Sequence, residues 1–111
     1  MSNKRSLKKN IRYICGDVAA ECITSSYLIP GVNKEILNSA VIKTAGLQTS
    51  SLSGANVAFD KTPSSFDNIA EYRKARKAYY SAAYKALIEK FNKQLQEIVK
   101  EMNSALPKKE N

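Results

Sequence analysis

The chain has 111 residues, of which 43% are hydrophobic and 25% are charged, a composition that predicts one globular domain and not a disordered chain. It contains no histidine, which removes the commonest general base, the Ser-His and Cys-His nucleophile pairs and the usual zinc and di-iron ligand sets. The net charge of +8 favours an anionic partner without specifying a fold. We therefore expect a small basic domain without catalytic residues, cofactor or metal.

The hydropathy of the chain argues against a membrane protein. Its longest apolar runs are three or four residues, far short of the ~18–20 residues that a spanning helix needs. The basic N-terminus is not followed by the apolar core of a signal peptide, because Arg12, Asp17 and Glu21 interrupt it. The basic N-terminal helix also differs from an amphipathic helix that lies on a membrane surface, because it lacks tryptophan and its apolar face is rich in Cys and Ala. We expect a cytoplasmic protein with reduced thiols.

The first helix is predicted over residues 6–27, after a frayed polar arm of residues 1–5. Apolar side chains recur there every three or four positions, as they do on one face of an α-helix. Ser6 can cap the start of this helix, and the Pro30-Gly31 pair cannot continue it.

A second, shorter helix is predicted over residues 33–45. Asn33 can cap its start, and Gly46 can close it in a left-handed conformation. The following stretch, 46–63, is rich in Ser, Thr, Gly and Asn and is predicted to be a loop. This loop is either mobile or packs its apolar side chains over the helices. Those side chains are Leu52, Val57 and Phe59.

A long C-terminal helix is predicted over residues 64–106, followed by a tail of residues 107–111. Ser64 and Asp67 resemble a capping box, and no Gly or Pro occurs before Pro107. Such a helix has roughly 40 residues and is about 60 Å long. The predicted fold is thus all-α, a small helical bundle of two shorter helices and one long helix.

The apolar positions of the long helix form two heptad runs, which are out of phase by two residues, or about 200°. The two halves should therefore bury different faces, and the two shorter helices cannot cover both. We expect a second copy to supply the missing surface, in a homodimer or a higher homo-oligomer. The alternative is a monomer whose helix breaks near Ser81, although no turn residue marks a break there. The predicted oligomer seam is Tyr72, Ala75, Tyr79, Ala82 and Ala86, then Tyr84, Ile88, Phe91, Leu95, Ile98 and Met102.

Two basic clusters are candidate phosphate contacts, one at the N-terminus and one in the long helix. Tyr80 is placed to stack on a base if it is exposed. No helix-turn-helix, RNA-binding sheet or zinc module is recognisable. A single continuous positive face would favour nucleic-acid binding, and scattered lysines would favour a plain bundle. The clusters are Lys4, Arg5, Lys8, Lys9 and Arg12, and Arg73, Lys74, Arg76 and Lys77.

Two further pairs lie on the first predicted helix. Cys15 and Cys22 are about 10.5 Å apart along it, beyond disulfide reach within one chain. They are interpreted as small hydrophobic residues, with pairing across a dimer as the alternative. Asp17 and Glu21 are interpreted as a solvated patch, or as partners for the basic face of the long helix.

The segment IRYICGDVAAECI and the long helix rich in Ala, Tyr and Lys resemble a family of small uncharacterised all-α proteins of Bacteroides-type bacteria. The resemblance implies a cytoplasmic, non-enzymatic protein and carries over no functional residue. We expect a structural or interaction protein that assembles as a homo-oligomer, with a dimer favoured and any other protein partner unidentified. The alternative is a basic accessory protein that binds the nucleic-acid backbone through the N-terminal arm and the 73–77 cluster.

Overall fold

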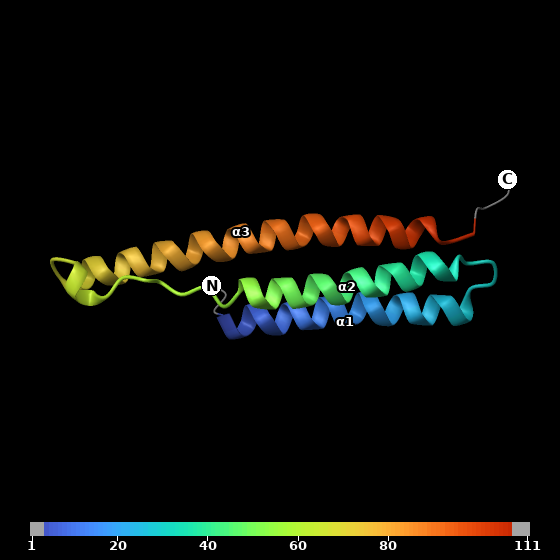
Figure 1. Cartoon of the computed structure of the whole chain (residues 1–111), viewed down its shortest axis with the longest axis horizontal. Helices are drawn as coiled ribbons and strands as arrows, with labels where there is room; N and C mark the ends of the chain where they lie inside the picture. Colours follow the sequence, from blue (N-terminus) through green and yellow to red (C-terminus); the bar gives the residue numbers. More distant parts are fainter. Residues whose placement is uncertain (1–3, 108–111) are drawn as a thin grey trace.

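The computed structural model describes residues 4–107, and within them it contains three α-helices and no strand. In chain order these are α1 (Lys4–Leu28), α2 (Lys34–Gly54) and α3 (Ile69–Ser104), with a short 3-10 turn, η1 (Pro63–Ser65), before α3. The molecule is a rod with extents of 68 × 23 × 18 Å (Figure 1). The predicted all-α class and the long last helix are confirmed.

The helices form an antiparallel hairpin, α1 and α2, that lies along only part of α3 (Figure 1). Helix α2 packs against both of the others, and α1 and α3 have few direct contacts. The second half of α3 lies beside this hairpin. Its first half, residues 69–86, projects beyond the hairpin and is called the arm below. The segment 55–66, called the strap, leaves α2 and runs back along the arm (Figure 1).

The contact between hairpin and α3 is built on a heptad in α2, in which every third or fourth residue is buried. Several of these residues are small, so that α1 and α3 can both approach α2 closely. The hydroxyl of Thr44 is only 1% exposed and donates to the carbonyl of Ala40 at 2.7 Å, so its burial leaves no unpaired polar atom. The heptad is Leu37, Ala40, Thr44, Leu47 and Ser51.

This heptad explains why the predicted end of the second helix at Gly46 is wrong. Helix α2 continues to Gly54, and among the described residues only Gly31 has a positive φ, of 79°. A glycine costs a helix about 1 kcal/mol relative to alanine. Burial of Leu47 and Ser51 one and two turns later outweighs that cost, since tertiary packing supplies most helical stability. The predicted break at Pro30-Gly31 is confirmed.

The predicted start of the first helix is also displaced. Lys4 is already helical, so Ser6 lies inside α1 and is not its N-cap. Of the predicted frayed arm, residues 1–3 lie outside the described residues, and residues 4 and 5 belong to α1. The helix ends at Leu28, one residue beyond the predicted end.

The start of the long helix is later than predicted, and its length is correspondingly shorter. Asn68 is the N-cap, and its side chain accepts from the backbone N–H of Glu71 at 2.9 Å. Ser64 lies in η1, so the predicted capping box is wrong. The helix has 36 residues, about 54 Å, and it is continuous past Ser81. Of the predicted tail, residues 108–111 lie outside the described residues.

Replacing Asn68 with alanine is expected to lower the free energy of unfolding by about 1 kcal/mol, because it leaves an amide of the first turn of α3 without its acceptor. Replacing Ser64 with alanine should change it by less than about 0.5 kcal/mol. Urea unfolding followed by circular dichroism compares the two variants. Equal effects, or a larger effect of Ser64→Ala, would contradict the observed helix start.

Candidate interaction surfaces

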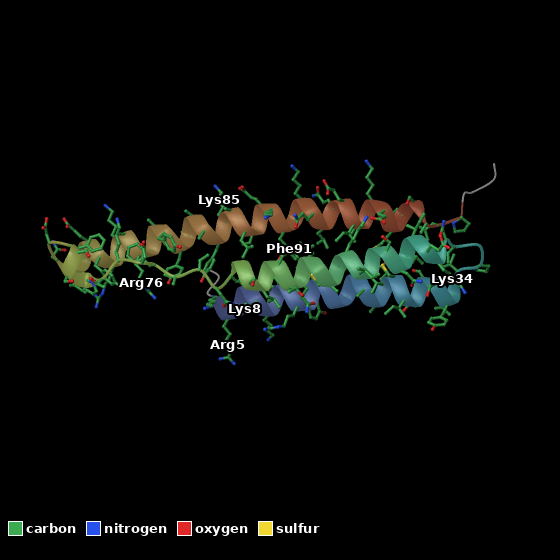
Figure 2. All side chains as sticks on the ribbon, in the orientation of Figure 1. Arg5, Lys8, Lys34, Arg76, Lys85 and Phe91 are labelled. Carbon is green, nitrogen blue, oxygen red and sulfur yellow. The ribbon has the colours of Figure 1, made fainter. Side chains whose placement is uncertain are left out.

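The predicted seam of the second half of α3 faces the hairpin of the same chain. Phe91, Ile98 and Met102 are buried there, and Figure 2 shows Phe91 between α3 and α2. Tyr84 and Leu95 are half-buried against the same core, as is Leu87, which sequence reasoning left out of the seam. Ile88 instead remains 37% exposed. This part of the seam is therefore mostly covered within one chain.

The aromatic face of the arm is covered by the strap. The ring of Phe59 lies 5.9 Å from that of Tyr72 and 5.4 Å from that of Tyr79, measured between centroids. The backbone N–H of Phe59 donates to the hydroxyl of Tyr80 at 3.1 Å. Phe66 completes the cluster, 6.3 Å from Phe59. Of the two alternatives for the predicted loop, packing over the helices describes the strap.

The strap leaves part of the predicted seam of the arm open. Tyr72, Ala75 and Tyr79 are half-buried, and the other two residues predicted for this part of the seam, Ala82 and Ala86, are exposed. The first half of the predicted seam thus divides into a tyrosine face under the strap and an open alanine face.

The two predicted basic clusters lie next to each other along the rod, since α1 begins near the middle of α3, where the arm ends (Figure 1). Arg5, Lys8 and Arg76 point to the same side of the molecule, and Lys85 points to the other (Figure 2). All nine cluster residues are exposed except Lys8, which is half-buried. None of them is in an ion pair with a carboxylate of residues 4–107.

The tyrosine proposed for base stacking is already engaged. The guanidinium carbon of Arg76 lies 5.1 Å from the centroid of the Tyr80 ring, a cation–π arrangement. The same ring lies 5.3 Å from that of Tyr79, and its hydroxyl holds the strap. Tyr80 is half-buried, so it acts first as a structural residue of the arm.

The acidic residues of α1 lie farther along the rod than the basic cluster. Residues 4–16 contain five basic and no acidic side chains, and the arm contains five basic and one acidic. Asp17 and Glu21 follow on α1, and both are exposed. Neither is in an ion pair within residues 4–107, so the predicted pairing with the basic face of the long helix is not made within one chain.

Two clefts separate α3 from the hairpin. The first, about 420 Å³ between α2 and α3, is bordered by Lys43 and Glu101, whose charged atoms are 2.6 Å apart. The hydrogen bond from Lys43 lowers the pKa of the Glu101 carboxyl. The second, about 160 Å³ between α1 and α3, is mainly apolar, with Ile14 and Ile88 on opposite walls. Sequence reasoning missed this second cleft, because it depends on how α1 lies beside α3.

The cysteines are free thiols in the core, 1% and 0% exposed. Burial raises the pKa of both, and the nearby Glu21 carboxylate adds to the rise at Cys22. This agrees with their interpretation as small hydrophobic residues. Among residues 4–107 no group of three potential ligands could hold a metal ion.

We expect both thiols to react much more slowly with Ellman's reagent in the native protein than in urea, since the thiolate is the reactive form. Because the folded-state pKa is raised, the native thiolate fraction at pH 8 is lower than in the unfolded chain. Absorbance of the released anion follows the reaction. Rapid reaction of both thiols in native protein would contradict their burial.

Comparison with known proteins finds no match, since no family model fits the sequence and no curated protein or solved structure is similar to it. Within the described part of the chain, no helix has the length and apolar character to cross a membrane.

Proposed function

We propose that this chain is a non-enzymatic interaction protein that works as a homodimer. The observation that supports the proposal is the mismatch between α3 and the hairpin, which covers only half of it (Figure 1). The arm has the strap on one face, and none of its residues is as buried as the heptad of α2. Since tertiary packing supplies most of the stability of a helix, a second copy is the simplest source of further packing for the arm.

Sedimentation velocity over a wide range of micromolar concentrations tests the proposal. A dimer has twice the monomer mass of 12.3 kDa, and we expect it to dissociate only on dilution. A single monomeric species at every concentration would overturn the proposal. The rod shape makes the monomer elute early in gel filtration, as a larger compact protein would, and it also slows sedimentation, so sedimentation equilibrium supplies a mass that does not depend on shape.

A second candidate function is binding to the phosphate backbone of nucleic acid, and the shared location of the two basic clusters supports it. Their side chains are exposed or half-buried and are not neutralised by carboxylates of the described residues. Contacts to phosphates release counterions, so affinity that arises from them falls steeply with salt. The basic residues of α1 would contribute to phosphate binding even if a second copy covered the arm.

Fluorescence anisotropy of a labelled mixed-sequence oligonucleotide, at about 50 and about 200 mM salt, tests this second function. The double variant Lys4→Gln and Lys9→Gln should weaken binding several-fold and flatten the salt dependence. The matched control, Lys93→Gln and Lys100→Gln, removes the same charge from exposed positions outside both basic clusters. Equal effects of the two variants, or no binding at the lower salt, would exclude the basic clusters as a site.

A further inference from the structure

We infer that the groove between α1 and α3 binds the arm of a second copy. The two copies form an antiparallel two-fold dimer whose axis passes close to Ile88. This inference rests on the proposed function, because it assigns the geometry of that homodimer. Three features of the chain support it: the open groove, the equal lengths of the two halves of α3, and the opposite charges of the arm and of Asp17 and Glu21 on α1.

The groove is open and apolar because α1 and α3 both pack on α2 and hardly meet each other. Ile14 on α1 and Ile88 on α3 are each 37% exposed on its two walls. Val99 is equally exposed and lies three helical turns beyond Ile88 on nearly the same face of α3. Ile88 and Val99 thus form an apolar strip on α3 that extends beyond the groove. The residues that line the groove itself are Leu7, Asn10, Ile11, Ile14, Leu87, Ile88, Phe91 and Asn92.

The arm has the right length for this groove. Residues 69–86 and 87–104 are the two halves of the 36-residue α3, and each is about 27 Å long. A two-fold axis between Ala86 and Leu87 lays each arm along the part of α3 that the partner's hairpin flanks. The contact is isologous, so each groove receives one arm and the assembly closes as a dimer.

The relative register of α1 and α3 follows from the contacts of α2. The carbonyl of Ala105 accepts from the N–H of Asn33, and Leu87 lies against Gly54, so α2 is antiparallel to α3 and α1 is parallel to it. The lining of the groove pairs residues 7–14 of α1 with residues 87–92 of α3. Farther along, residues 17 and 21 of α1 therefore lie at about the level of residues 96 and 100 of α3.

At that level, the α1 side is acidic. Asp17 is seven residues after Asn10, and Glu21 is seven after Ile14, so both carboxylates lie on nearly the same side of α1 as the groove lining. Both are exposed, and neither is in an ion pair with a described residue. The groove therefore has two carboxylates available to a basic partner.

The arm brings basic side chains to this level. The two-fold axis places residue 77 of one copy opposite residue 96 of the other, and residue 73 opposite residue 100. Lys77 is eleven residues before Ile88 and so lies within about 20° of the same face. Lys77 is thus placed to meet Asp17 of the other copy, and Arg73 to meet Glu21. Their aliphatic stems can lie on the apolar strip while the charged ends reach the rim.

Cross-linking tests the position of the axis. A residue beside a two-fold axis meets its own copy, so Ile88→Cys should be joined into a covalent dimer by a short bis-maleimide. Lys90→Cys is the matched control, because it is exposed at nearly the same level but about 200° around α3. The native thiols are buried and should not compete. Equal cross-linking of the two variants, or of Lys90→Cys alone, would overturn the inferred geometry.

A charge exchange tests the pairing. The variant Asp17→Lys with Glu21→Lys should raise the dissociation constant roughly tenfold or more, and so should Arg73→Glu with Lys77→Glu, because each places like charges together. Combining all four changes should restore the constant to within about threefold of wild type. Failure of the combined variant to recover would overturn the pairing, provided that circular dichroism shows all variants equally helical.

The two proposals fail in different ways. A wild-type chain that is monomeric in sedimentation overturns both the homodimer and its geometry. If the wild type is a dimer but the Lys90→Cys variant cross-links as readily as Ile88→Cys, or the charge-exchange variants dimerise like the wild type, the homodimer is retained and this groove is excluded. If only an added oligonucleotide protects the arm from cross-linking or proteolysis, the arm is a nucleic-acid surface and this inference is wrong.

Discussion

Replacing Phe91 with alanine is expected to lower the free energy of unfolding by about 3–5 kcal/mol, the largest effect of any single change considered. Phe91 is 4% exposed, lies between α3 and the hairpin (Figure 2) and lines the groove. Truncation removes the transfer free energy of the ring and leaves a cavity that the rigid helices close only in part. For a domain with a total stability of about 5–15 kcal/mol, this is a substantial fraction.

Tyr27→Ala is the matched control for this change, since it also removes an aromatic ring from a helix but from a position that is 82% exposed. We expect the control to change the free energy of unfolding by less than about 0.5 kcal/mol. Urea unfolding at one fixed protein concentration measures both variants, because the stability of a dimer depends on concentration. A loss below about 1 kcal/mol for Phe91→Ala would contradict the observed packing of α3 on the hairpin.

Replacing Phe59 with alanine is expected to lower the stability by about 2 kcal/mol and to act mainly on the arm. The ring is half-buried and makes tilted contacts with Tyr72 and Tyr79. Each such aromatic pair contributes about 0.5–1.5 kcal/mol beyond the burial of apolar area. Without the ring, the strap loses its main contact with the arm, and the hydrogen bond to Tyr80 alone must hold it.

Hydrogen exchange measured by mass spectrometry checks where this effect falls. Amides of the arm should exchange faster in Phe59→Ala than in wild type, while those of α2 and the second half of α3 keep their protection. Lys61→Ala, at an exposed strap position, is the control and should leave both regions unchanged. Uniform loss of protection along the whole chain would mean that the strap stabilises the hairpin as well.

Local signals in the sequence determined the type and order of the elements. These signals are the helical spacing of apolar residues, the N-cap at Asn33 and the break at Pro30-Gly31. Each depends only on residues that are close in sequence, and the structure contains each of them. The long helix follows from an interval without Gly or Pro. The errors lie at the boundaries, where two local signals competed. Gly46 resembles a helix end and Ser64 a helix start, but burial decided against the first and Asn68 provided a better cap than the second.

Only the tertiary structure decided which faces are covered and which remain open. The heptad of residues 84–102 has the same pattern whether it packs on a second copy or, as here, largely on the hairpin of its own chain. The division of the arm into a part under the strap and an open part depends on where the chain runs after α2. The groove between α1 and α3 likewise depends on two helices that α2 holds apart. Spacing along one helix records which residues share a face, but the partner of that face is set by the path of the rest of the chain.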